Sequence, residues 1–262
     1  MSDSQTEAVI NAIRATQRAF GAVGIQTMDR AMDTEAIYEH CIDTKQRFII
    51  RSKVNRRLLM NNEILETTQI AGEMKGKFRI DYTDKHGKIH RCRVSFQSVR
   101  LPSRPDEPLT LVMVYGYDKE PMLLLTNLTI RGKTTCLRVV KTYLCRWRIE
   151  EYYRFKKNQF SLENIRVLSM DSVCSLVFLL AVLSGWIAMF ANKQGESLLL
   201  AEVLVRAMRV YDIPQFTLYA VTDGIYGVLK GAAKGIRFAL LHPPQSQQLS
   251  LFKPSAFNLS AA

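Results

Sequence analysis

The chain has 262 residues, of which 47% are hydrophobic, so it can bury a substantial core as one large domain or two small ones. Lysine and arginine number 36 against 24 acidic residues, which gives a net charge of +12 at pH 7. This composition excludes a largely disordered chain. It makes a polyanion the expected partner, while an anionic membrane surface also fits the charge.

The cysteines and the N-terminal residues both indicate a protein of the reducing cytoplasm. Five cysteines are scattered through the chain, without a Cys-x-x-Cys pair or a histidine spacing that suits zinc. The first seven residues contain neither a basic stretch nor an apolar run, so we expect no secretory signal.

The N-terminal pattern predicts a helix, a short buried strand and a second helix. Apolar residues recur at helical intervals over residues 5–20, and residues 22–28 have the composition of a strand. A helix is expected over 34–43, with Asp33 placed to cap it. Asp29 is then left free at the end of the strand.

The middle of the chain is predicted to be rich in β-structure. Residues 46–53 have the β-branched and aromatic content of a strand, and residues 54–120 alternate and carry turn signals. A hairpin turning at Gly87 is expected. The further strands expected are 77–83 and 88–96, which form that hairpin, 109–116 and 121–128.

The C-terminal half is predicted to be helical, with helices from about 134 to 157, 170 to 191 and 198 to 211. Residues 172–191 carry no charge and are long enough to span a bilayer. Because this run stands alone and contains serine and glycine, a buried core helix is favoured over a membrane span. The sequence beyond Pro214 is mixed, with a loose tail.

One segment sets a single carboxylate among cations and aromatic residues. On a continuous helix, Tyr143, Arg146, Glu150 and Lys157 fall within an arc of roughly 60°. An i,i+4 ion pair between Arg146 and Glu150 on a solvated helix explains part of the pattern without any chemistry. Alternatively, the carboxylate holds a divalent metal while its neighbours bind phosphates.

The spacing Tyr-x2-Arg-x3-Glu-x6-Lys, with Trp147–Glu151 inside it, resembles the signature of the insertion-sequence-4 family of DDE transposases. Three other stretches resemble the same family in the expected order. They are Asp29–Asp33, Arg47–Lys53 and Leu123–Asn127, so that the resemblance covers about residues 5–190.

This resemblance implies an α/β fold with a ribonuclease H-like transposase core, interrupted by a β-rich insertion. The expected parts are a partial core at 1–53, the insertion at 54–120, the return of the core with the signature helix at 121–191, and a helical C-terminal region with a loose tail at 192–262.

The resemblance also implies metal-dependent strand cleavage and transfer in DNA transposition. Asp29 and Glu150 are the expected catalytic residues and ligands of Mg²⁺, with Mn²⁺ as an alternative ion. Tyr143, Arg146 and Lys157 are expected to contact DNA phosphates.

A second basic cluster gathers around the strand predicted at 46–53. Arg51 and Lys53, with Arg56 and Arg57 beside them, are equally compatible with DNA contact and with a solvated strand edge.

The sequence departs from the family pattern in two places. The family's first catalytic acid should lie on an earlier strand, but the only earlier acids, Asp3 and Glu7, belong to the first helix or its start. Met122 stands where some relatives stack a flipped base on tryptophan. We therefore expect an incomplete core, an exposed edge on the strand that carries Asp29, and little or no activity of this chain alone.

Two functional hypotheses remain open at this point. The first is a transposase acting as a homodimer on double-stranded DNA, both transposon ends and target, in the cytoplasm and associated with the nucleoid. The second is a non-catalytic DNA-binding or regulatory fragment. Neither hypothesis involves a membrane or a small-molecule substrate.

Overall fold

The computed structural model describes residues 3–74, 76–84, 88–164, 166–167, 169–192, 198–207 and 217–230. It divides into two compact units, Met1–Trp147 and Arg148–Ala262, and each is treated by itself below. Gly87 and the tail from residue 231 lie outside the described residues, so the turn and the loose tail stay predictions.

The first unit begins with the predicted helix–strand–helix order. Both helices are confirmed, whereas the strand is shorter than residues 22–28. The first helix ends where Gly21 adopts a φ of 73° and donates its N–H to the Gln17 carbonyl at 2.7 Å. The elements are α1 (Asp3–Phe20), β1 (Gln26–Met28), the 3-10 turn η1 (Arg30–Met32), α2 (Glu35–Asp43) and β2 (Phe48–Arg51).

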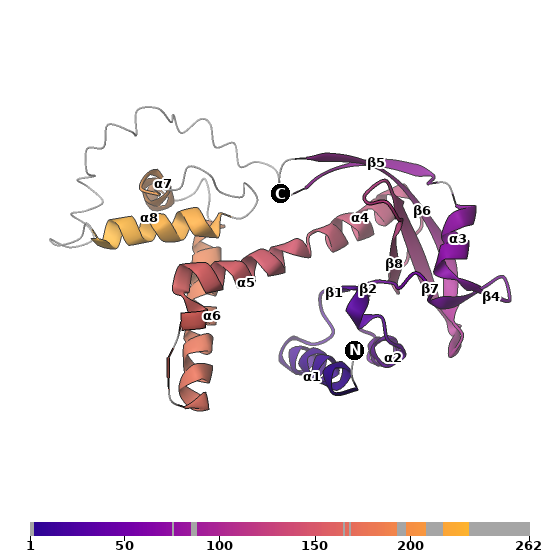
Figure 1. Ribbon diagram of the computed structural model, residues 1–262, viewed down its shortest axis with the longest axis horizontal. Coiled ribbons are helices and arrows are strands. Elements are labelled where there is room, and N and C mark those ends of the chain that lie inside the picture. Colours follow the sequence, from indigo (N-terminus) through magenta and orange to yellow (C-terminus); the bar gives the residue numbers. More distant parts are fainter. Residues whose placement is uncertain are drawn as a thin grey trace. The chain divides into compact units, whose positions relative to one another are not determined.

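The following strands extend the same sheet rather than forming another one. The hydrogen-bonded order is β1-β2-β8-β7-β6-β3-β4, and β5 pairs with β6 (Figure 1). Only the pair β1–β2 is parallel among the described pairs. The further strands are β3 (Arg57–Met60), β4 (Glu63–Glu66), β5 (Phe78–Thr83), β6 (Ile89–Leu101), β7 (Arg104–Tyr115) and β8 (Met122–Thr126).

Strand β1 pairs with β2 alone among the described strands, so its other edge has no strand beside it. The hairpin β3–β4 and the short helix α3 (Thr67–Glu73) were not foreseen. The signal for the hairpin was Asn61-Asn62 between two apolar runs, because both residues take the positive φ that a tight hairpin turn requires.

Alternation along the strands sends side chains to two opposite cores. Ile50 belongs to the core shared with α1, α2 and α3, whereas its neighbour Ile49 belongs to the core shared with α4 (Lys133–Leu144). Both residues are fully buried. The sheet therefore has an α4 face and an opposite face, and each is covered by helices.

The helix predicted from 134 to 157 is interrupted. Helix α4 ends at Leu144, and α5 (Trp147–Phe160) begins after a turn. The Arg146 N–H bonds the Tyr143 carbonyl at 2.9 Å, three residues back, so the last turn tightens instead of continuing. Since no glycine or proline marks this site, the break could not be predicted from the sequence.

The second unit contains α5, η2 (Leu162–Asn164), α6 (Met170–Ala191), α7 (Leu198–Val205) and α8 (Leu218–Lys230). The prediction of α6 as a helix is confirmed, but its prediction as a buried core helix is wrong. Only Ser184, Ile187 and Ala191 are buried, while Phe178 and Trp186 are 67% and 54% exposed. The reason is that α6 packs against α8 on one side only, among the described helices.

Helix α6 is also the one described helix that is long and apolar enough to cross a membrane, which is weak support for a span. Helix α7 ends at Val205, and the rest of the helix predicted to 211 lies largely outside the described residues. Helix α8 was not foreseen beyond Pro214, where the sequence is punctuated by glycine.

The close packing of α7 on α8 gives the first prediction. A Cβ at Gly224 would lie 2.0 Å from the Val203 carbonyl oxygen, whereas a Cβ at Gly185 would have no atom within 4 Å. Gly224→Ala should lower the free energy of unfolding by about 1–3 kcal/mol through overpacking. Gly185→Ala, the matched control, should be neutral or raise it by up to about 1 kcal/mol. Urea unfolding measures both, and equal stability of the two variants would contradict this packing.

Candidate nucleic-acid interface

Asp29 directly follows β1 and caps the turn η1. Its Oδ1 accepts a hydrogen bond from the Ala31 N–H at 2.9 Å. The prediction that Asp29 is left free while Asp33 caps α2 is therefore wrong. Thr34 is the N-cap residue of α2, and its side chain makes no cap bond. Asp33 does not cap the helix because its side chain belongs to a buried polar network.

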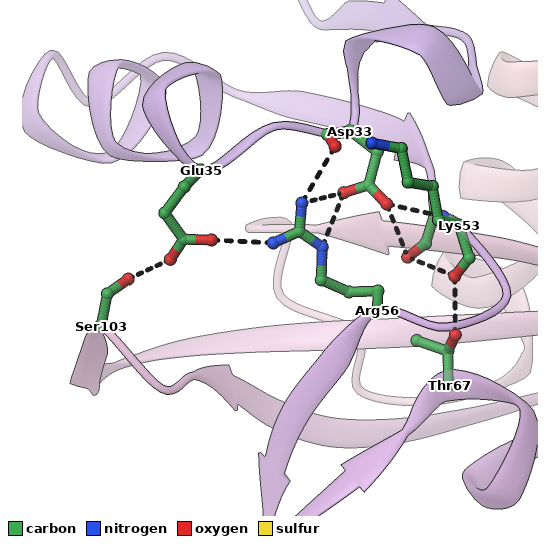
Figure 2. A network of polar contacts seen from close by, with 7 residues as sticks. Asp33, Glu35, Lys53, Arg56, Thr67 and Ser103 are labelled. Carbon is green, nitrogen blue, oxygen red and sulfur yellow. Dashed lines mark hydrogen bonds and ion pairs between the residues drawn. The ribbon is translucent and has the colours of Figure 1, made fainter.

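The Asp33 carboxylate is the centre of that network and is fully buried. The Arg56 guanidinium reaches it with Nε at 2.9 Å and Nη2 at 2.7 Å from Oδ1, and Figure 2 shows the two side chains facing each other. The Lys53 N–H donates to Oδ2 at 2.6 Å. Arg56 also pairs with Glu35 at 2.7 Å, and Glu35 accepts from the Ser103 hydroxyl.

This network joins η1, α2 and the segment between β2 and β3. Arg56 is therefore occupied inside the protein and does not belong to a cluster that contacts a ligand. Lys53 is different, since only its backbone is engaged and its side chain is exposed. The predicted second basic cluster thus keeps Arg51, Lys53 and the exposed Arg57.

A compact group of charged and aromatic side chains lies on the α4 face, around Tyr143. Burial raises the pKa of the Tyr143 hydroxyl, Arg146 and Arg51 lower it, and Asp29 raises it again. Arg51, Arg146 and Asp29 are therefore near enough to act electrostatically on the Tyr143 hydroxyl within the first unit. Because the pKa lies above its ordinary value of 10.0, Tyr143 is a neutral hydrogen-bond donor at neutral pH.

The cations of this group are suited to an anion. The Arg51 Nε is buried and has no hydrogen-bond partner among the described atoms. The Arg146 Cζ lies 6.0 Å from the centre of the Tyr143 ring, which holds the guanidinium beside the phenol. Guanidinium groups bind phosphate oxygens in a two-pronged geometry. The group can therefore bind a phosphate next to Asp29.

Sequence reasoning missed an aromatic cluster beside this group. Tyr117 lies 6.0 Å from Tyr82 and 5.1 Å from His90, centroid to centroid, and Asp84 Oδ2 lies 2.9 Å from the His90 Nε2. Burial raises the pKa of Tyr117, and the Arg51 charge lowers it, so the two are neighbours. The sequence signal that could have revealed this cluster was the presence of aromatic residues at alternate positions of the predicted hairpin.

Glu150 and Lys157 belong to α5, in the second unit. Glu150 is exposed in the first turn of the helix, and Lys157 pairs with Glu163 at 2.5 Å. The prediction that the four signature residues share one face of one helix is wrong, because Tyr143 lies in the last turn of α4, which ends at Leu144, and the chain turns at Cys145 before α5. Whether Asp29 and Glu150 converge stays a prediction.

The described residues of the first unit do not by themselves fit a divalent metal. No group of three or more His, Cys, Asp or Glu side chains suited to a metal occurs among the described residues. Asp29 is a single carboxylate with one oxygen already bonded to the Ala31 N–H, and a divalent ion needs more oxygen ligands than it can supply.

An α/β unit that carries Arg51 and Arg146 beside Tyr143 is compatible with a class of protein that acts on a polyanion. A family model described as "Transposase DDE domain" matches residues 4–185, more than half of the 262-residue chain. The chain belongs to this family of transposase domains. The match supports a transposase function with DNA as the substrate, and domains of this family generally use a divalent metal.

The Asp33 network gives the second prediction. Asp33→Asn leaves the Arg56 guanidinium, which is only 14% exposed, without its carboxylate. The free energy of unfolding should fall by about 3–5 kcal/mol, measured by urea unfolding. Asp43→Asn is the matched control, because the ion pair of Asp43 with Arg104 is 56% and 39% exposed, and its loss should cost no more than about 1 kcal/mol. If Asp33→Asn lowers the free energy of unfolding no more than Asp43→Asn does, the network does not contribute the expected stability.

Proposed function

We propose that this chain is a transposase domain of the insertion-sequence-4 group with a ribonuclease H-like core. It binds transposon-end DNA as a homodimer, in the cytoplasm and on the nucleoid. Its phosphate contacts come from Tyr143, Arg146, Lys157, Arg51 and Lys53. Asp29 and Glu150 supply carboxylates for Mg²⁺ or Mn²⁺ during strand cleavage and transfer.

The observation that supports this proposal is the contact of Arg146 with Tyr143, 6.0 Å from Cζ to the ring centre, with Arg51 and Asp29 near enough to act electrostatically on the Tyr143 hydroxyl. Tyr143 and Asp29 are more than 100 residues apart in the sequence and belong to separately matched stretches of the family pattern. A carboxylate beside phosphate-binding cations is what cleavage of a DNA backbone requires, because the scissile phosphate must be held next to the metal ligands.

The ligand set limits what the chain does alone. Two divalent ions need several carboxylates around them, and Asp29 and Glu150 provide only two. We therefore expect weak metal binding and little cleavage by the isolated chain. The second candidate function, a non-catalytic DNA-binding or regulatory fragment, is favoured by the same shortage of acids.

The third prediction concerns DNA binding. Arg51→Gln should weaken binding of a fluorescent 30-base-pair duplex about tenfold, because a charged phosphate contact contributes about 1.5–3 kcal/mol. Tyr143→Phe should weaken it about threefold, and Asp29→Asn should leave it unchanged or tighten it, since a negative charge near the phosphate is removed. Fluorescence anisotropy at fixed salt measures each variant. Arg18→Gln, which removes an equal charge from the exposed end of α1, is the control, and equal effects at Arg51 and Arg18 would contradict the assignment.

The fourth prediction separates chemistry from binding. The chain alone should nick supercoiled plasmid DNA slowly or not at all in Mg²⁺ or Mn²⁺, and Asp29→Asn and Glu150→Gln should abolish any nicking that occurs. Robust nicking that both substitutions abolish would establish the enzyme and refute the expected inactivity. Robust nicking that survives both substitutions would refute the two carboxylates as the site.

A further inference from the structure

The hairpin of β5 and β6 carries an arginine-rich surface that the proposed site does not use. In the register of this pair, Arg79 lies directly opposite Arg93, and Asp81 lies directly opposite Arg91. Because successive residues of a strand point to opposite faces, these four side chains share one face. All four are exposed. They also line a depression of about 500 Å³ on this hairpin.

This surface lies on the side of the sheet away from α4. Ile80 and Cys92, the pair between the two charged pairs, belong to the core beneath α4 together with Val139 and Tyr143. Arg79 and Arg93 must then point to the opposite face. A molecule bound there is separate from one bound beside Tyr143 and Arg51 within the first unit.

Among the described residues, the charges of this surface are not balanced. Three guanidinium groups face one carboxylate, and none of the three has a hydrogen bond or ion pair with any described residue. Like charges directly opposite one another in a strand pair are destabilising, so the Arg79–Arg93 pair costs stability in the free protein. An anion that bridges the two guanidinium groups removes this cost.

The backbone also holds one of these arginines in place. The segment between α3 and β5 passes so close that a Cβ at Gly76 would lie 2.4 Å from the Arg93 Cβ, and Gly76 has a φ of 76°. On the other side, Arg93 lies opposite Tyr115, whose hydroxyl bonds the Ala71 carbonyl of α3 at 2.8 Å. The base of the Arg93 side chain is therefore fixed between two ordered segments before any ligand arrives.

We propose that Arg79, Arg91 and Arg93 bind the phosphate backbone of a DNA duplex, as a second DNA contact on the face opposite to α4. Arg91 and Arg93 lie two residues apart on one strand, roughly 6.6 Å, so that their long side chains reach successive phosphates. The net charge of +12 favours an acidic partner for the chain as a whole. Exposed arginines without an apolar centre suit a phosphate backbone better than a protein surface.

The inference shares the DNA partner of the proposed function but uses different residues on a different face. A contact of this kind reads no base sequence, since guanidinium groups on phosphates carry no sequence information. Two DNA-binding faces on one unit allow the chain to hold two DNA segments at once.

The test measures how DNA binding depends on salt, using the full chain and a 20-base-pair duplex of arbitrary sequence. Each phosphate contact contributes about 0.9 to the slope of log affinity against log salt concentration. The triple variant Arg79→Gln, Arg91→Gln, Arg93→Gln should therefore lose about 2.7 from the slope and bind at least tenfold more weakly. The control removes the same three charges elsewhere, as Arg14→Gln, Arg18→Gln, Arg100→Gln, and should change the slope by clearly less.

The result that overturns the proposal is an equal change of slope in the triple variant and the control. The triple Lys variant at positions 79, 91 and 93 should recover most of the slope, because it keeps the charge. Melting temperatures show whether folding is intact, and the triple Gln variant should melt at or above the wild-type temperature, since it relieves the Arg79–Arg93 repulsion. If it melts lower, the salt dependence is measured on the three single Gln variants instead. Each should lose about 0.9 from the slope, and an unchanged slope in all three would overturn the proposal.

A failure of the proposed function has a different signature. In that case Arg51→Gln and Tyr143→Phe leave binding unchanged, whereas the triple variant on the hairpin still loses its slope. If only the hairpin assignment fails, the substitutions on the α4 face weaken binding and the hairpin variant behaves like its control.

Discussion

The buried ion pair between Asp33 and Arg56 is the constraint on which the interface depends. Removing a carboxylate from water is costly, and here the Arg56 guanidinium and the Lys53 N–H offset that cost. Asp33 also ends the turn η1, where its backbone N–H donates to the Arg30 carbonyl, and Asp29 begins that turn. One buried group therefore fixes both the acid that follows β1 and the basic segment that follows β2. An exposed pair could not do so, because water would compete for each contact.

The alternation of side chains along the strands distributes the basic residues over two surfaces. Arg51 follows Ile49 by two positions and shares its face, with α4 and Tyr143. On β5 and β6 the buried pair beneath α4 leaves Arg79 and Arg93 on the opposite face. A slip of one residue in the β5–β6 register would exchange these roles. The register is thus as important for the proposed DNA contacts as the number of arginines.

The break between α4 and α5 changes what the family signature means in three dimensions. Tyr143 is held against the sheet, and Arg146 lies in the turn after it, whereas Glu150 begins the next helix. Spacing along the sequence assumes a straight helix, and that assumption fails where a turn tightens by one residue. The exposed face of α6 illustrates a related limit, because an apolar sequence favours burial without specifying which partner covers it.

The sequence by itself determined the local elements and the family, since hydrophobic periodicity, turn residues and motif spacing are properties of neighbouring residues. Helices α1 and α2, strand β2 and the paired strands β5 and β6 were predicted in this way. The tertiary structure alone decided that Asp33 is buried against Arg56, that Arg51 and Asp29 act electrostatically on Tyr143, and that three arginines of one hairpin share a face. These are contacts between distant segments, and their energies depend on desolvation and register, which no local pattern encodes.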